Sequence, residues 1–240
     1  MKKNYEMDMC SGPILGKLLT FTIPLIFSGI LQLLFNAADV IVVGRFAGSQ
    51  SLAAVGSTTA LINLMINIFI GLSVGVNVIV ARYYGAKREK DVQDTIHTAM
   101  ALSIVSGLFL IVMGQLLSRP MLELMGTPDD VIDKSTIYMR IIFIGMPANM
   151  IYNFGSAILR AVGDTKRPLY FLTAAGVINV VLNLFFVIMF RMDVAGVALA
   201  TAISQAISAF LVILCLMESE GGLKLHLKDL KIHRSKFRQI

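Results

Sequence analysis

The chain has 240 residues, of which 56% are apolar and only 15% are charged, against about 25% charged residues in an average soluble domain. Its mean hydropathy is +0.77, and a soluble fold of this size cannot bury that much apolar surface. These values argue against a cytosolic enzyme, a disordered protein and a nucleic-acid-binding protein. The formal net charge of +6 is typical of a membrane protein whose cytoplasmic loops collect basic residues.

Six apolar runs are each long enough to cross a bilayer as a helix, which takes about 20 mostly apolar residues. A backbone in lipid must satisfy its own hydrogen bonds, so runs of this length predict helices rather than barrel strands. In chain order the runs cover residues 18–43, 52–80, 95–118, 137–157, 169–190 and 194–217. We therefore predict an all-α membrane protein with a six-helix transmembrane bundle over residues 14–217, preceded by a short cytoplasmic N-terminus, residues 1–13.

The remaining segment, residues 218–240, is basic and contains no long apolar run; its basic residues are Lys224, Lys228, Lys231, Arg234, Lys236 and Arg238. We interpret it as a cytoplasmic linker near anionic lipid, with no nucleic-acid partner. If both termini are cytoplasmic, that side of the membrane holds sixteen basic residues and the other side holds five. The positive-inside rule favours this topology, so the predicted location is the cell membrane, with several passes and both termini in the cytoplasm.

Asp39 is the only carboxylate deep within any of the six runs, and an ionisable group at membrane depth is costly enough to suggest a function. It shares a helix face with Ser28, Gln32 and Asn36, at spacings of four, four and three residues. A polar stripe on an apolar helix is expected to face protein or a water-filled cavity rather than lipid. The alternative is a carboxylate that reaches toward water or pairs with Arg45.

Four other runs carry polar residues at the same helical spacing. These are Asn63 and Asn67, then Asn149, Asn153 and Ser156, then Asn179 and Asn183, and finally Thr201, Gln205 and Ser208. Any one pair is explained equally well by hydrogen bonds between helices, each worth on the order of 1 kcal/mol. Five stripes in six runs favour a shared polar cavity, and the residues that we expect to face a substrate there are Gln32, Asn36, Asn63, Asn153 and Gln205.

The chemistry that these residues offer is limited to one carboxylate, amide oxygens and a threonine hydroxyl. Hard oxygen ligands suit Na+ or a proton better than a transition metal, and neutralisation of Asp39 would relieve the cost of burying its charge. No nucleophile lies beside a base, so we expect neither enzyme activity nor a cofactor. Pro24 interrupts the first run and is expected to kink it, which predicts a hinge on the helix that carries Asp39.

Two segments resemble a known transporter family. Residues 159–168, LRAVGDTKRP, strongly resemble the LRxxGDTKxP signature of the multidrug and toxic compound extrusion (MATE) family, and residues 81–87, ARYYGAK, look like the second cytoplasmic loop of that family. The first run and the stretch LAAVG at residues 52–56 also fit, so the resemblance covers about residues 13–220. The signature positions are occupied here by Arg160, Gly163, Asp164, Thr165, Lys166 and Pro168.

The resemblance implies a secondary antiporter that exports organic cations and other amphipathic compounds in exchange for Na+ or H+. It implies that Asp39 is the coupling carboxylate and, by position, that Asn179, Asn183 and Thr201 complete a cation site with it. Some relatives have a second acid at the position of Asn183, so the amide here leaves one carboxylate. That carboxylate matches the charge of one Na+ or carries one proton. The expected partners are small amphipathic cations and membrane lipid.

Members of this family have about twelve helices in two six-helix lobes, so the chain resembles the N-terminal lobe. It is then a fragment that lacks its C-terminal lobe, which we favour, or a half-transporter that pairs with a second copy. Two other functions stay open. A lipid-linked oligosaccharide flippase of the same superfamily would need basic residues in its cavity to hold a pyrophosphate, and Arg140 is the nearest candidate. An inactive truncated membrane fragment would use its polar stripes for packing alone.

Overall fold

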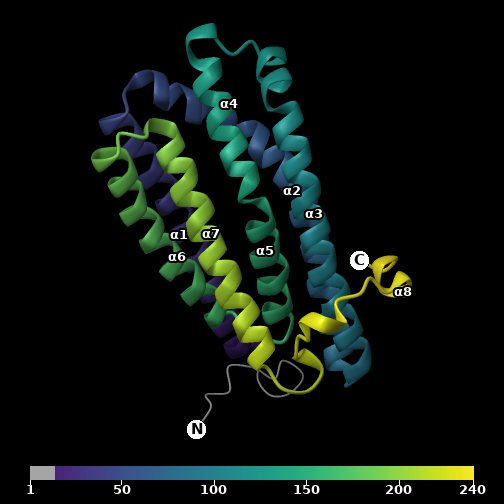
Figure 1. Ribbon diagram of the computed structural model, residues 1–240. Helices are drawn as coiled ribbons and strands as arrows, with labels where there is room; N and C mark the ends of the chain where they lie inside the picture. The colour runs from purple at the N-terminus through teal and green to yellow at the C-terminus, as the bar shows by residue number, and fades with distance from the viewer. Residues whose placement is uncertain (1–13) are drawn as a thin grey trace.

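The protein is an elongated bundle of long helices (Figure 1). The computed structural model describes residues 14–240, so the N-terminal segment that we expect to be cytoplasmic, residues 1–13, lies outside the described part. Within that part the helices of the bundle are α1 (Ile14–Phe46), α2 (Ser49–Gly85), α3 (Glu89–Leu124), α4 (Asp129–Ile144), α5 (Met146–Ala161), α6 (Lys166–Leu184) and α7 (Asp193–Glu218). A π-helical turn, η1 (Phe185–Met189), continues α6.

These helices confirm the prediction of an all-α protein with six membrane spans. Five of them, counting α6 together with η1, are each long and apolar enough to cross a membrane, and the bent pair α4–α5 makes the sixth span. Several helices extend beyond the apolar runs: α2 has 37 residues, or about 55 Å at 1.5 Å per residue. Because the hydrocarbon core is about 30 Å thick, the ends of such helices reach into the polar regions on both sides.

The fourth span is bent by 47° between α4 and α5, a feature that its apolar pattern does not predict. Pro147 follows the break, and a proline removes one helical hydrogen bond and clashes with the preceding turn. Gly145, at the break itself, lies close to α7, where an added Cβ would come within 3.0 Å of the Cβ of Ala202. The bend therefore sits where a glycine allows the backbone of the span to approach α7.

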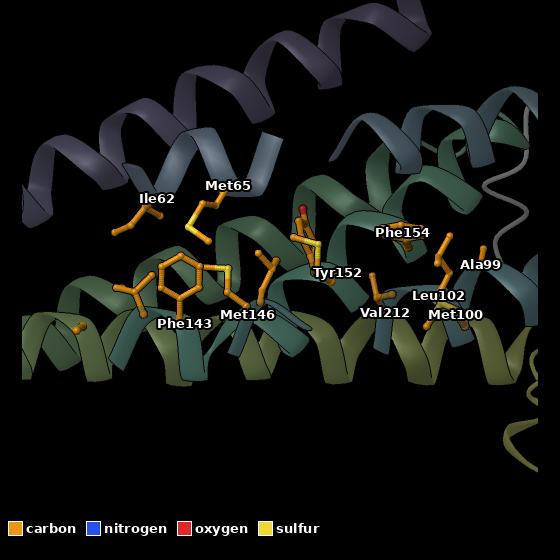
Figure 2. Packing of buried hydrophobic residues seen from close by; sticks show 14 of the residues in the cluster. Ile62, Met65, Ala99, Met100, Leu102, Phe143, Met146, Tyr152, Phe154 and Val212 are labelled. Atoms are coloured by element: carbon orange, nitrogen blue, oxygen red, sulfur yellow. The ribbon is translucent and has the colours of Figure 1, made fainter. Parts of the chain in front are cut away.

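The apolar core lies around α5, between α2, α3, α4 and α7. Figure 2 shows Ile62 and Met65 of α2 lying across from Phe143 of α4 and Met146 of α5. Phe143 and Met146 are fully buried. By contrast, α1 packs chiefly on α6 and exposes a row of large apolar side chains, of which Leu33 is 70% exposed. The core thus supports one side of the bundle, while α1 lies at its edge and is joined to it mainly through α6, which also packs on α7.

After α7 the chain crosses to α3 in a segment that we call the tail, residues 219–240 (Figure 1). The tail contains two short 3-10 turns, η2 (Gly221–Leu223) and η3 (Leu227–Asp229), and a single helical turn, α8 (Arg234–Phe237). Leu223 and Leu225 are buried, and the Leu225 amide donates to the carbonyl of Leu216 in α7 at 3.0 Å. The tail is therefore packed against the bundle along part of its length.

Candidate functional site

A close approach of α6 to α1 positions the candidate site. Phe35 and Asp39 lie one turn apart on α1, and Gly176, Asn179 and Asn183 follow at three- and four-residue spacing on one face of α6. A Cβ added at Gly176 would collide with the Phe35 ring. The missing side chain thus lets α6 lie directly against that ring, and one to two turns further along the two helices Asn183 faces Asp39.

Four polar residues form a continuous hydrogen-bonded chain across α1, α6 and α7, which we call the polar chain: Asp39, Asn183, Asn179 and Thr201. The Asn183 side-chain amide donates to Asp39 Oδ1 and to Asn179 Oδ1, the latter at 3.2 Å. The Asn179 amide donates in turn to Thr201 Oγ1 at 3.2 Å, and this hydroxyl donates to the Val197 carbonyl at 3.0 Å. The structure therefore brings together the four residues that the sequence proposes as a cation site.

The centre of the polar chain is closed to solvent. Asn183 is completely buried and Asn179 is 5% exposed. One oxygen there, Asn183 Oδ1, is buried and has no hydrogen-bond partner among the described residues. A buried polar atom without a partner costs about 1–3 kcal/mol, so such an atom calls for an explanation. It adds a free oxygen to a group that already contains a carboxylate, a second amide oxygen and a hydroxyl, the hard ligands that a Na+ ion prefers.

Three of the five residues predicted to face a substrate, Gln32, Asn36 and Asn63, have exposed side chains in this bundle. Gln32 and Asn36 precede Asp39 on α1, and Asn63 lies on α2. These three polar side chains thus lie on the surface of the lobe and do not line a closed cavity within it. Their proposed role in substrate binding stays a prediction.

The other two proposed cavity residues lie inside the bundle. The Asn153 side-chain amide donates to Asn149 Oδ1 at 2.9 Å, one turn earlier on α5. Gln205 Oε1 of α7 is buried without a hydrogen-bond partner in the described residues, and it faces the break in the fourth span, 3.1 Å from where a Cβ of Gly145 would lie. The structure therefore does not gather the five residues into one enclosed space, and their role also stays a prediction.

The helix that carries Asp39 passes through Pro24 without interruption, because α1 is continuous from Ile14 to Phe46. Pro24 is buried, and the Ser28 hydroxyl one turn later donates to its carbonyl at 2.8 Å. A hinge at Pro24 stays a prediction.

The signature segment forms the turn between α5 and α6. Gly163 adopts a left-handed backbone conformation, with φ of 84°, which a glycine reaches without steric cost. Asp164 is fully buried, accepts the Arg167 backbone amide at 3.1 Å and pairs with the Arg167 guanidinium. The Tyr152 hydroxyl of α5 donates to the Pro168 carbonyl of α6 at 3.1 Å. The turn thereby fixes the start of α6, the helix that supplies Asn179 and Asn183.

The remaining signature residues differ in their surroundings. Thr165 is 2% exposed, whereas the Lys166 side chain is exposed. Arg160 Nε is buried and has no hydrogen-bond partner within residues 14–240. Sequence reasoning identified these positions but missed Gly176 and Phe35, which set the spacing of α1 and α6. The available signal was the glycine that falls three residues before Asn179, on the same face of the helix.

A separate hollow of about 350 Å³ lies at the end of the bundle opposite the tail, beside η1. Its lining contains none of the residues proposed for the cation site or the substrate cavity. It is formed by Phe46, Ala47, Val187, Ile188, Arg191 and Asp193.

Comparison with known proteins agrees with the fold and the signature. The family model described as MatE matches residues 24–185. The chain belongs to the MatE family. A probable multidrug resistance protein, YoeA of Bacillus subtilis (strain 168), is 35% identical over 198 residues, which cover 81% of this chain and 42% of YoeA. A FAD transporter of Shewanella oneidensis is 27% identical and is covered over 45% of its length.

A crystal structure of a MATE protein in the bent conformation superposes with a TM-score of 0.85 at 25% identity, covering 92% of this chain and 50% of that one. The chain therefore spans about half the length of the relatives that it matches. This length agrees with one six-helix lobe of a two-lobe MatE transporter.

Proposed function

We propose that this chain is the N-terminal lobe of a membrane antiporter that exports amphipathic organic cations in exchange for Na+ or H+, and that Asp39 holds the coupling ion. The observation that carries the proposal is the polar chain, in which a carboxylate deep in α1 is joined to two amides and a hydroxyl from α6 and α7. The likeness to a probable multidrug resistance protein and to a multidrug export protein supports the export of drugs.

The arrangement suggests how the lobe would respond to the ion. Asn183 now offers its NH2 group to Asp39, while its oxygen has no partner. An amide side chain exchanges the positions of its oxygen and nitrogen when it turns over. Such a turn would direct the free oxygen of Asn183 toward a cation held by the carboxylate. A proton on Asp39 would instead remove the negative charge while one carboxyl oxygen still accepts from the amide.

Cation binding would then change the link between α1 and α6. Na+ would bridge Asp39 and Asn183 in place of their hydrogen bond, whereas a proton on Asp39 removes the charge-assisted part of that bond, a type of bond worth about 1.5–3 kcal/mol. Weakening that bond would let the part of α1 beyond Pro24 move relative to α6. Because α1 lies at the edge of the bundle and packs chiefly on α6, its motion leaves the core around α5 unchanged.

The polar side chains of Gln32, Asn36 and Asn63 are exposed on the lobe, and we assign them to a substrate cavity that a second lobe closes. That second lobe is the C-terminal half that the longer relatives contain, or a second copy of this chain. Within residues 14–240 no basic side chain is hydrogen-bonded or ion-paired to the polar chain, and Arg140 is exposed. No observation therefore favours the flippase function.

The test is ethidium efflux from vesicles that contain the full natural gene product, under an imposed Na+ gradient or an imposed pH gradient. Asp39→Asn preserves the shape of the side chain but cannot hold a charge. The matched control is Asp130→Asn, since Asp130 lies in an exposed position at the start of α4. FAD serves as a second transport probe because one relative carries the name of a FAD transporter.

We expect efflux by the wild type and by Asp130→Asn to follow one of the two gradients, and efflux by Asp39→Asn to fall to the level of empty vesicles. The gradient that drives efflux identifies the ion. Undiminished gradient-driven efflux from Asp39→Asn, with equal amounts of protein in the vesicles, would refute the role of Asp39. Transport of FAD without transport of ethidium would refute amphipathic organic cations as the substrate class.

A further inference from the structure

The tail is held on the bundle in one orientation by contacts with α3. The His226 backbone amide donates to His97 Nε2 at 3.2 Å, and His97 Nδ1 lies 2.9 Å from the Gln93 carbonyl. His97 is 4% exposed. Further along, the His233 backbone amide donates to Thr98 Oγ1 at 3.1 Å. Two backbone groups of the tail are thus bonded to the side chains of two consecutive residues of α3, which fixes which side of the tail points outward.

A second set of contacts fixes α8. Lys236 is 6% exposed; its ammonium lies 4.0 Å from the centre of the Tyr83 ring and 2.5 Å from Asp91 Oδ1. Burial lowers the pKa of Lys236, but the hydrogen bonds and electrostatic attraction from Asp91 and Tyr83 together raise the pKa overall. The Tyr83 hydroxyl also donates to Gln239 Oε1 at 2.7 Å. One basic residue of the tail is therefore used to attach it.

The other basic residues of the tail point away from the bundle. Lys224, Lys228, Lys231, Arg234 and Arg238 are all exposed, and no carboxylate in the described residues pairs with any of them. Three large apolar side chains lie among them on the outside, with Leu227 50%, Ile232 43% and Phe237 49% exposed. The tail thus combines unpaired positive charge with exposed apolar groups, a composition typical of segments that bind at a membrane surface.

The tail lies against the two spanning helices α2 and α3. The tail leaves α7 and comes to lie on the outside of α3, on the side away from α1 and α6 (Figure 1). Its last residue reaches α2 at Gly75, where an added Cβ would lie 2.6 Å from the Ile240 carbonyl oxygen. Gly75 precedes the end of α2 by ten residues, or about 15 Å along the helix axis. The end of the tail therefore lies beside a spanning helix, within the apolar part of its sequence.

From this geometry we infer that the tail binds the anionic phospholipid surface of the bilayer leaflet next to it, through its five outward basic residues and the apolar groups of Leu227, Ile232 and Phe237. The basic groups contact lipid phosphates, and the apolar groups enter the region between headgroups and acyl chains. The inference is independent of the proposed transport activity, because it depends only on the placement of α2 and α3 across a membrane.

The experiment measures hydrogen exchange of residues 224–240 in the protein reconstituted into two kinds of nanodisc, one of phosphatidylcholine alone and one that also contains phosphatidylglycerol. The test variant is Lys228→Gln with Lys231→Gln, which removes outward charge and keeps Lys236. The control is Lys87→Gln with Lys90→Gln, which removes the same charge from exposed positions around the turn between α2 and α3. Phe237→Ser tests the apolar contribution.

Each basic residue near an anionic surface contributes roughly fivefold in binding. We therefore expect exchange in the tail to be several-fold slower in the anionic discs for the wild type and for the control pair. This difference should be largely lost in Lys228→Gln with Lys231→Gln, be reduced in Phe237→Ser, and vanish at about 1 M salt, where the Debye length is about 3 Å.

Equal exchange rates in both discs for the wild type would overturn the inference and leave the tail facing solvent. If the control variant, Lys87→Gln with Lys90→Gln, lost as much protection from exchange in anionic discs as the test variant, the inference would also be overturned. The attraction to anionic lipid would then come from the whole basic end of the bundle and not from the tail. Exchange of the test variant in neutral discs shows whether the tail is still attached. If that rate matches the wild type while the anionic protection disappears, the lipid contact is assigned to the tail.

Discussion

The carboxylate of Asp39 is bonded to a neutral amide, and this choice of partner affects its chemistry. A lysine or arginine would neutralise the carboxylate permanently, whereas the Asn183 amide leaves the negative charge in place. Asn179 and Thr201 extend the polar chain to α7 through hydrogen bonds between uncharged side chains. The polar chain can therefore orient the carboxylate without removing the charge that a cation or a proton would satisfy.

Thr201 tests whether the far end of the polar chain belongs to the ion site. Thr201→Val keeps the branched shape and removes the hydroxyl, which accepts from the Asn179 amide. If the site uses this oxygen, half-maximal efflux should need on the order of tenfold more coupling ion, the equivalent of one hydrogen bond of about 1.4 kcal/mol. Thr201→Ser retains the hydroxyl and is expected to resemble the wild type. The measurement is the dependence of ethidium efflux on ion concentration; identical curves for the two variants would remove Thr201 from the site.

Among the helices, the contact of α6 with α1 depends on one missing side chain. Gly176→Ala places a methyl group against the Phe35 ring, and overpacking of this kind costs about 1–3 kcal/mol. We expect the substitution to lower the thermal stability of the protein in detergent and to weaken ion coupling, because it moves α6 away from Asp39. The midpoint of thermal unfolding and the efflux assay measure the two effects.

Gly71→Ala is the matched control, since Gly71 is also in a helix and has open space around its Cβ position. Alanine is the better helix former by about 1 kcal/mol, so this control should be neutral or slightly stabilising. Phe35→Leu combined with Gly176→Ala should recover part of the lost stability. A destabilisation by Gly176→Ala that Phe35→Leu does not change would point to a cause other than the contact with the ring.

The sequence predicted the elements better than their contacts. The apolar runs placed all six spans, because the length of such a run reflects the thickness of the bilayer. The four-residue spacing placed Asn179 and Asn183 on one face, but spacing within one helix does not say which helix lies opposite. Only the resemblance linked them to Asp39 and Thr201. The close approach at Gly176 depends on the side chain opposite it, which no single segment contains.

The bend at Gly145 and the attachment of the tail were not predicted, for two different reasons. The run at residues 137–157 was recognised by its apolar composition, which is the same for a straight and a bent helix, although Gly145 and Pro147 within it are a local signal for a break. The contact of His226 with His97 joins residues 129 positions apart in the chain, and the composition of the tail shows only that it is basic. For the tail the missing information is tertiary packing.

For the whole molecule, the lobe has two unequal sides. The core around α5 is closely packed, while α1 presents large apolar side chains, including Leu33, on its outside. The polar side chains of Gln32 and Asn36 lie on the same helix and are exposed. A helix with both kinds of side chain on its surface suits a position between lipid and a second lobe, which agrees with a chain that spans half the length of its relatives.

The single carboxylate of the polar chain has an electrical consequence. Holding one monovalent ion, the site has no net charge; without the ion it carries one negative charge. A membrane potential acts on a moving charge with about 2.3 kcal/mol per 100 mV, so the voltage acts on this site only in the step that moves it without the ion, and a monovalent cationic substrate carried in that step cancels the charge. We expect a potential imposed with K+ and valinomycin to change the rate of ion-driven efflux of an uncharged substrate and to leave efflux of a monovalent cation such as ethidium unchanged. The voltage would then be a second driving force for uncharged substrates alone.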